Sequence, residues 1–424
     1  NVLDDNEAWV LFSKHARLPQ NSELRSKARE VVKECRGLPL AIETVGSALR
    51  NKSRADYEDA ILRLSHANYV NIESVDREIY PLIELSINYL KCEETVELLF
   101  LCSLYPEDSE IFLEDLTRIT FGLELFKDVN SVEEARQTTF RHLRELVDAC
   151  LLLPMGSDWS LPGIGRRQVF GPSVKVHDIV RDVALWLSGK RNNSYLLATP
   201  SVKHHRNRYE AATAISIKNC ELDGPLNREL DWPLPDRLKY PQLKLLLLET
   251  DALFWELKDD CFEMMRNLQV LVLSSPGDYY WKADYTLPVS IEHLRNLRTF
   301  HLYDQRDLDR YTGHGRWCGA NIIGKLKSLQ ILSLDGNCSG TLPQEIEELT
   351  NLRLLYLSGF LNLQKIPRNV LSSLTALEEL EICGHFMVEK DLLSEITSLP
   401  HLTALTASVN LDGVLPTLSF RKPQ

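Results

Sequence analysis

The sequence predicts a multidomain α plus α/β fold, in which a helical bundle and a winged-helix domain are followed by a leucine-rich-repeat solenoid. Three observations support this prediction. Capped helical patterns fill the first half of the chain, two short apolar segments flank a Gly- and Pro-containing loop near its middle, and a leucine pattern recurs through the second half. The expected boundaries are a helical part at 1–70, a winged-helix domain at 71–195, a linker at 196–211 and a solenoid at 212–424.

Helices are expected from the first residues onward. Asp4 and Glu7 have the spacing of a capping box, and Ser131 and Glu134 repeat it. Gly37 suits the positive φ that ends a helix, and Pro39 suits the first position of the next one. Extended segments at 150–153 and 174–176 then flank the polar stretch 157–172, which predicts a two-stranded wing with that stretch at its tip.

The second half repeats the unit L-x-x-L-x-L. The units begin at Leu243, Leu268, Leu297, Leu329, Leu352, Leu377 and Leu402, with a weaker unit before them at Ala212. The spacings of 25, 29, 32, 23, 25 and 25 residues predict a stacked array whose short strands line a concave face, with helical returns after Leu-Pro phrases. Leu415 and Pro416 open a further return that does not finish, so we expect the array to continue in a longer protein.

Strand alternation predicts which side chains lie on the concave face. They are Leu245, Leu247, Val270 and Val272 in the early repeats, and Glu379 and Glu381 in a late one. We expect the apolar end to pack against the preceding domain, with a partner site as the alternative. The acidic end is expected to be a solvated face unless a basic partner is found.

The two longest spacings place extra residues after the strands that begin at Leu268 and Leu297. These insertions contain Tyr279, Tyr280, Trp281, Tyr285, Tyr311 and Trp317. Aromatic side chains are common at the centres of binding interfaces, so a recognition patch is one interpretation. Local packing of long loops is an equal alternative.

Composition excludes several classes of function. The balance of 48 Lys and Arg against 60 Asp and Glu gives a net charge of −12, which argues against nucleic acid as a partner. Nine scattered cysteines form neither a dense disulfide framework nor a metal knuckle, and we expect a reducing, cytoplasmic location. No apolar run approaches the roughly twenty residues of a membrane span.

Four phrases in the first half, followed by the repeats, resemble plant intracellular nucleotide-binding leucine-rich-repeat (NB-ARC LRR) immune receptors of the coiled-coil class. They are Glu7-Ala8-Trp9-Val10-Leu11-Phe12, Gly37-Leu38-Pro39-Leu40-Ala41, the run from Phe100 to Asp108, and Val176-His177-Asp178. The resemblance covers nearly the whole chain. It implies a switch between ADP-bound and ATP-bound states, with Gly37, Leu38 and Pro39 at the adenine and His177 at the terminal phosphate of ADP. Val176 stands where the family most often has Met.

The resemblance also implies partners. The repeats would sense a pathogen effector or a guarded host protein and would restrain the switch through contact with the winged-helix domain, and activation could lead to an oligomer. No G-x-x-x-x-G-K-[ST] loop occurs in the chain, so we expect this piece to bind nucleotide weakly, without the Mg²⁺ of the longer protein, and not to be an enzyme. The alternative is a nucleotide-independent repeat adaptor or decoy.

Overall fold

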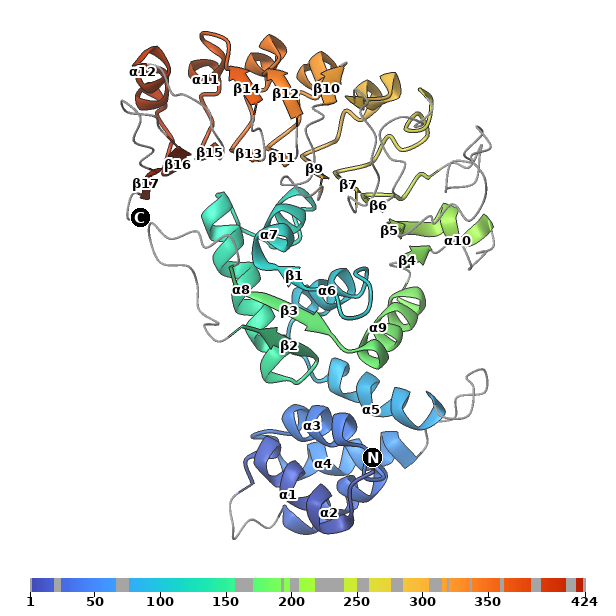
Figure 1. Cartoon of the computed structure of the whole chain (residues 1–424). Helices are drawn as coiled ribbons and strands as arrows, with labels where there is room; N and C mark the ends of the chain where they lie inside the picture. The colour runs from blue at the N-terminus through green and yellow to red at the C-terminus, as the bar shows by residue number, and fades with distance from the viewer. Residues whose placement is uncertain are drawn as a thin grey trace. The chain divides into compact units, whose positions relative to one another are not determined.

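The structure is a computed structural model that describes residues 2–18, 24–65, 76–156, 171–191, 194–198, 206–217, 240–249, 259–275, 285–304, 315–318, 320–335, 338–358, 362–382, 390–408 and 417–421 (Figure 1). The chain divides into two compact units. The first consists of Asn1–Leu113, Thr138–Ser160 and Pro172–Arg191, and the second of Glu114–Gln137, Leu161–Gly171 and Asn192–Gln424.

The first unit begins with a run of helices. Its helices are α1 (Asp5–Ala16), α2 (Arg25–Glu34), α3 (Pro39–Ala48), α4 (Arg54–Ser65) and α5 (Asp76–Asn88). The first predicted capping box is confirmed: the Asp4 carboxylate accepts hydrogen bonds from the backbone of Asn6 and Glu7, and Glu7 accepts one from the backbone of Asp4. Phe12, Val31 and Ile42 are among the buried side chains that pack between these helices.

The rest of the first unit combines helices with a small sheet. The elements are α6 (Glu93–Cys102), β1 (Ile111–Phe112), β2 (Leu152–Met155), β3 (Ser173–Val176) and α9 (Asp178–Lys190). The strand order is β1-β3-β2, and both pairings are antiparallel. The two extended segments predicted around the polar stretch do pair as strands, but β2 begins at Leu152 rather than at residue 150, and β1 adds a third strand to the predicted two. Residues 157–170 of that stretch lie outside the described residues.

Two helices belong to both units. In α7 (Leu113–Gly122) all residues after Leu113 belong to the second unit, and α8 (Val132–Asp148) belongs to it up to Gln137. The second predicted capping box forms with a shift of one residue. The backbone of Glu134 donates to the Ser131 hydroxyl, but the Glu134 carboxylate accepts from the backbone of Asn130 instead of Ser131.

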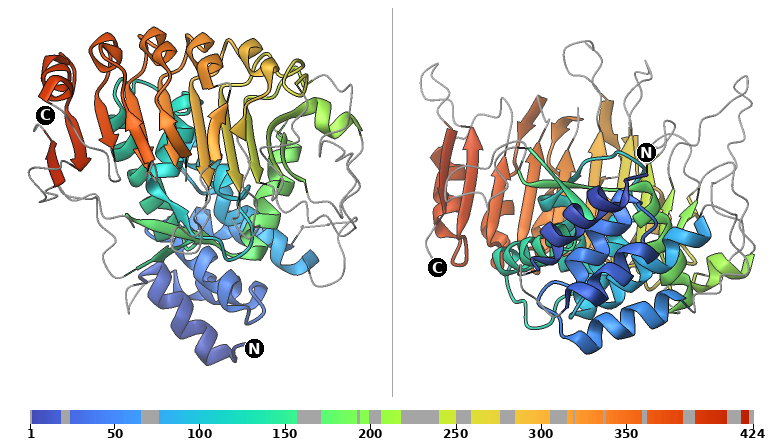
Figure 2. Two further views of the ribbon diagram at one scale, coloured as in Figure 1. Left: turned by 45° about the horizontal axis from the view of Figure 1, so that its top comes forward. Right: turned by 90° about the horizontal axis from the view of Figure 1, so that it is seen from below.

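The second unit is built on a ten-stranded sheet. In spatial order the strands are β17 (Thr417–Arg421), β16 (Ala404–Ser408), β15 (Glu379–Ile382), β13 (Leu354–Ser358), β11 (Ile331–Asp335), β9 (Thr299–Asp304), β7 (Val270–Ser275), β6 (Leu245–Glu249), β5 (Ala212–Ile217) and β4 (Ser194–Ala198). Every pair is parallel except β16 with β17. All eight predicted repeat strands are confirmed, and β4 is an additional strand before them. Figure 2 shows the strands side by side.

The helical returns run along the other side of the array. They are η1 (Val289–His293), η2 (Ala320–Lys325), η3 (Gln344–Glu348), α11 (Val370–Ser373) and α12 (Lys390–Ser398), while α10 (Arg206–Ala211) precedes β5. A second parallel sheet, β8 (Tyr285–Thr286), β10 (Gly315–Cys318), β12 (Cys338–Thr341) and β14 (Asn362–Lys365), joins neighbouring repeats. The leucines that define the repeat fill the core between strands and returns, which is why each unit is stable only beside its neighbours.

The predicted return after Leu415 and Pro416 is wrong for the described residues that follow. Residues 417–421 form β17, which pairs antiparallel with β16. The segment Thr417-Leu418-Ser419-Phe420 alternates polar and apolar residues, which is the period of a strand, and its backbone satisfies the N–H and C=O groups at the edge of β16. Among the described residues no helix is long and apolar enough to cross a membrane.

Candidate functional site

The turn at Gly37 fixes the start of α3. Gly37 has φ +73°, its carbonyl accepts a 2.8 Å hydrogen bond from the backbone of Leu3, and a Cβ atom there would lie 2.4 Å from the Leu3 oxygen. Only glycine therefore fits. Leu38 is extended, and Pro39 is the first residue of α3, as predicted. The Pro39 ring is exposed beside the half-buried Leu38.

His177 caps the N-terminus of α9, and its side chain is 41% exposed. The backbone of Ile179 donates at 2.6 Å to Asp178 Oδ1, and the same oxygen contacts His177 Nδ1. The backbone of Ile179 also donates at 3.3 Å to His177 Nδ1, which is how the imidazole caps the helix. The imidazole thus stands at a helix N-terminus, where backbone N–H groups favour an anion.

Helix α5 links the two parts of this predicted nucleotide site. It packs against α3, which begins at Pro39, and against α9, which begins after His177 (Figure 1). Within the described residues, the hydrogen bond and ion pair of the His177 side chain join it to its chain neighbours Ile179 and Asp178. The roles of Gly37, Leu38, Pro39 and His177 in nucleotide binding stay a prediction.

The predicted aromatic patch falls largely outside the described residues, which do not include Tyr279, Tyr280, Trp281 and Tyr311. Trp317 lies in β10 of the second sheet, in register with Tyr285 of β8. The two longest insertions are thus joined by backbone pairing. Whether their aromatic residues bind a partner stays a prediction.

The concave face of the repeats is occupied, within the second unit, by the segment 114–137. The Thr299 hydroxyl on β9 donates at 2.9 Å to the carbonyl of Arg118 on α7. At the end of α7, a Cβ on Gly122 would lie 2.4 Å from Thr299 Oγ1 and 2.7 Å from Val270 Cγ2. The apolar part of the face, with Leu245 and Val270 buried, is therefore closely packed rather than open.

At the acidic end, the expectation of a solvated face is wrong. Glu379 is only 2% exposed because Arg136 of α8 covers it with a bidentate ion pair at 2.8 and 2.9 Å. Arg136 is itself 2% exposed, and it also donates at 2.6 Å to Glu114 and contacts Glu133. Burial by itself would lower the pKa of Arg136. The carboxylates of Glu114 and Glu379 have the larger combined effect, so the pKa of Arg136 is raised.

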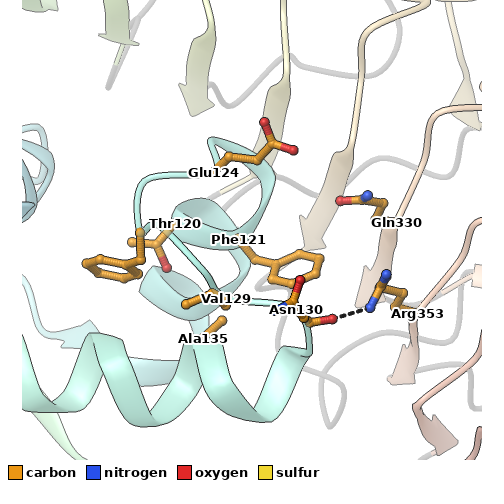
Figure 3. Close-up of a pocket in the computed structure, with 9 residues that line it drawn as sticks. Thr120, Phe121, Glu124, Val129, Asn130, Ala135, Gln330 and Arg353 are labelled. Atoms are coloured by element: carbon orange, nitrogen blue, oxygen red, sulfur yellow. Dashed lines mark hydrogen bonds between the residues drawn. The ribbon is translucent and has the colours of Figure 1, made fainter.

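Beside this cluster lies a second polar contact. Arg353 donates to Glu378 at 2.5 Å and to the carbonyl of Asn130, while Glu378 accepts at 2.9 Å from the backbone of Val132. Burial raises the pKa of Glu378, against the lowering effects of Val132 and Arg353. Figure 3 shows the small pocket here, with Phe121 and Asn130 on one side and Arg353 on the other.

The centre of the face holds a third group. Arg118 is buried, forms a 3.1 Å ion pair with Asp115, and lies 4.7 Å over the ring of Tyr356 on β13. His301 on β9 is buried nearby, and burial together with the charge of Arg118 holds its pKa well below the usual range. Specific charge pairs, rather than apolar area alone, therefore fix the position of segment 114–137 on the repeats.

Sequence reasoning missed Arg118 and Arg136 as contact residues. A usable signal was present for Arg136, because it stands in the same helical stripe as Val132, Ala135 and Thr139, all of which are buried. A charge inside an apolar stripe indicates a buried partner of opposite charge.

In sequence comparisons, the chain is similar to disease resistance proteins of a plant. No protein-family profile matches the chain. In Arabidopsis thaliana, disease resistance protein At4g27190 is 28% identical over 387 residues, 90% of this chain and 36% of that protein. Probable disease resistance protein At1g61300 is 26% identical over 97% of the chain and 50% of its own length, and disease resistance protein UNI is 23% identical over 96% and 45%.

The chain thus spans between about a third and a half of these relatives. A solved structure, "Plant peptide hormone receptor RGFR1 in complex with RGF2", overlaps 49% of the chain and 33% of its own chain at 18% identity with a TM-score of 0.29, which does not establish a shared fold. The three relatives, in contrast, match across both units. Over most of its length, the chain is a homologue of plant disease resistance proteins.

Proposed function

We propose that the chain is part of a nucleotide-switched immune receptor in which the repeats hold segment 114–137 in the resting state. The observation that supports this proposal is the bidentate pair between Arg136 and Glu379, which buries two charges. The names of the relatives support a role in plant defence. The cytoplasm is the expected location, and the chain itself is not proposed to be an enzyme.

Nucleotide is the second part of the proposal. The exposed Pro39 ring beside Leu38 and Gly37 offers an apolar plate to an adenine base, and the exposed imidazole of His177 at the start of α9 offers a donor to a phosphate. These residues fit ADP, which supplies a diphosphate charge. A phosphate loop and Mg²⁺ ligands, for which the chain has no motif, belong to another domain in this proposal, and residues 71–195 act as its winged-helix domain.

The energy of the switch comes from differential affinity. A ligand shifts an equilibrium only by the difference in its free energy of binding to the two states. ADP favours the state in which segment 114–137 rests on the repeats, while an effector or a guarded host protein bound to the repeats, together with ATP, favours its release. Release exposes a buried positive charge at Arg136 and several carboxylates, a surface suited to a new contact such as assembly into an oligomer.

The test uses the full-length gene product that contains this chain, expressed in leaf tissue. Arg136→Glu places a new carboxylate against Glu114, Glu133 and Glu379, and it should cause defence signalling without a pathogen. The double variant Arg136→Glu, Glu379→Arg re-forms an opposite-charge pair and should restore the resting state in part, because Glu114 and Glu133 still face position 136. Arg141→Glu, at an exposed position of the same helix, is the matched control. An Arg136→Glu protein that accumulates normally and stays silent contradicts the proposal, and Glu379→Gln provides a milder variant if it does not accumulate.

The aromatic insertions are the proposed contact with the sensed partner. Trp281→Ala and Trp317→Ala, together with Ala at Tyr279, Tyr280 and Tyr311, remove the largest side chains of both insertions. Binding of the recognised effector or host protein should then be lost while resting-state behaviour is retained. Unchanged binding in a pull-down assay is the outcome that contradicts this role.

A further inference from the structure

Three potential metal ligands gather in the first unit, away from the predicted nucleotide site. Cys92 immediately precedes α6, Glu94 lies in its first turn, and His142 lies on α8. One ligand atom of each residue is within 4.8 Å of the ligand atoms of the other two. Cys92 Sγ and Glu94 Oε2 are 3.4 Å apart.

The backbone explains how these side chains meet. Cys92 is extended, with φ −120° and ψ 127°, in the capping position of α6, and its hydrogen bond to Glu94 ties the thiol to the first turn of the helix. His142 arrives from α8 and is buried, whereas Cys92 and Glu94 are half-buried. The cluster is therefore anchored on its histidine side and accessible from the other.

Hydrogen bonds orient the imidazole for ligation. The Thr95 hydroxyl donates at 2.8 Å to Glu145, so its 2.7 Å contact with His142 Nδ1 requires that Nδ1 carries the proton. The lone pair then resides on Nε2. A metal-binding histidine in proteins usually donates its other N–H to such an outer partner, which fixes the tautomer and the plane of the ring.

The ligand types and distances select the ion. Thiolate, imidazole and carboxylate together suit Zn²⁺, while Mg²⁺ and Ca²⁺ prefer oxygen alone. Bond lengths of about 2.0–2.3 Å in a tetrahedron place ligand atoms roughly 3.3–3.7 Å apart. The 3.4 Å separation of Cys92 Sγ and Glu94 Oε2 already lies in that range.

We propose that Cys92, Glu94 and His142 form a Zn²⁺ site, with Thr95 and Glu145 as its outer partners and water at the fourth position. Binding replaces the thiol proton of Cys92, which passes to solvent, and no oxidation or reduction takes place. The ion ties the start of α6 to α8. It thereby stabilises the packing of the two helices that lead into segment 114–137 and out of it.

Co²⁺ is the probe, because a tetrahedral cobalt–thiolate site absorbs visibly and shows a sulfur-to-metal charge-transfer band. The metal-free, reduced chain is titrated with Co²⁺ and then with Zn²⁺. We expect one equivalent of Co²⁺ to produce both features and Zn²⁺ to abolish them. Absence of a charge-transfer band, or a stoichiometry well below one, overturns the proposal.

Variants identify the ligands. Cys92→Ser should abolish the charge-transfer band and weaken Co²⁺ binding at least about tenfold. Glu94→Gln should also weaken Co²⁺ binding at least about tenfold. Glu145→Gln, a change at an outer partner, should weaken binding by about 10–100-fold but retain the band. Cys150→Ser is the matched control, because Cys150 Sγ lies 3.4 Å from His15 Nδ1 but belongs to no group of three ligands among the described residues. Since Cys92 and Glu94 are half-buried, their variants should stay folded, which circular dichroism verifies. A band that persists in Cys92→Ser or disappears in Cys150→Ser contradicts the assignment.

Discussion

The guanidinium of Arg136 and the carboxylate of Glu379 form a two-bond ion pair across 243 positions of sequence, with N···O distances of 2.8 and 2.9 Å. Both residues are almost completely buried. A buried pair of this kind adds little net stability compared with apolar residues of the same size, but loss of one partner leaves the other charge uncompensated. The pair therefore specifies which segment occupies the concave face.

Arg136→Met tests this interpretation. The variant leaves the Glu379 carboxylate buried without its cation, so the contact between segment 114–137 and the repeats should lose about 3–5 kcal/mol. Hydrogen exchange at the amides of β15 measures this loss locally. The double variant Arg136→Met, Glu379→Met should recover most of it. Arg141→Met, at an exposed position, should change stability by less than about 0.5 kcal/mol. Equal exchange in the two Arg→Met variants contradicts the interpretation.

Gly122→Ala tests the apolar end of the same contact. The added methyl group has no room, because its carbon would lie 2.4 Å from Thr299 Oγ1 and 2.7 Å from Val270 Cγ2. Overpacking of this kind costs about 1–3 kcal/mol. Urea unfolding monitored by hydrogen exchange at β7 and β9 provides the measurement.

Gly189→Ala is the matched control for Gly122→Ala. Gly189 also lies near the end of a helix, α9, but an added Cβ meets nothing within 4 Å. Because alanine favours the helical backbone, this variant should be neutral or stabilising by up to about 1 kcal/mol. If both alanines behave alike, close packing of α7 on the repeats is not what limits position 122.

The repeat strands could be predicted because leucine spacing is a local property that recurs. Strand β4 could not, because Ser194–Ala198 lies before the first leucine unit and its pairing with β5 depends on a neighbour in space. The same limit explains Glu379. Alternation placed it on the concave face, but only the fold brings Arg136 to it, so the acidic end was wrongly interpreted as solvated.

For the residues of the predicted nucleotide site, the sequence predicts the local conformation but not the arrangement in space. The local conformations of Gly37, Pro39 and His177 follow from their own chemistry: a positive φ, a first helical position and a cap. The common role proposed for them depends on helices α3 and α9, which both pack against α5, and no sequence period predicts such packing. The common role is inferred from the resemblance of the four sequence phrases to plant immune receptors.

His177→Ala should loosen the resting state of the full-length protein that contains this chain. The variant removes the donor proposed for the terminal phosphate of ADP, so the copurified ADP content should fall by about tenfold or more, as expected for loss of a charge-assisted hydrogen bond of about 1.5–3 kcal/mol. Asp178→Asn should have a smaller effect in the same direction, because the Asp178 carboxylate contacts the imidazole and helps to orient it. His401→Ala, exposed on the repeats, is the control. Full ADP retention in His177→Ala contradicts the role.

Acid should weaken the repeats through His301. Burial, followed by the charge of Arg118, lowers the pKa of His301 well below its ordinary value of 6.5. Below pH 6.5 His301 therefore takes up a proton in the unfolded chain but not in the folded chain. The contribution of neutral His301 to the free energy of unfolding is complete above that pH, and it is lost by about 1.4 kcal/mol per pH unit as the pH falls. Glu378 and Asp115 act in the opposite sense, because burial raises the pKa of each carboxyl and acid then favours the folded state.

His301→Phe separates these effects. The phenyl ring keeps the aromatic contact with Tyr303, whose centroid lies 6.0 Å away, but cannot take up a proton. Hydrogen exchange at β9, measured from neutral pH down to about one unit below 6.5, should therefore show a stability slope that is smaller by about 1.4 kcal/mol per pH unit than in the parent chain. His401→Phe, at an exposed position, should leave the slope unchanged. Since Glu378 and Asp115 remain in both variants, equal slopes for His301→Phe and the parent chain would mean that His301 is not the group that senses acid.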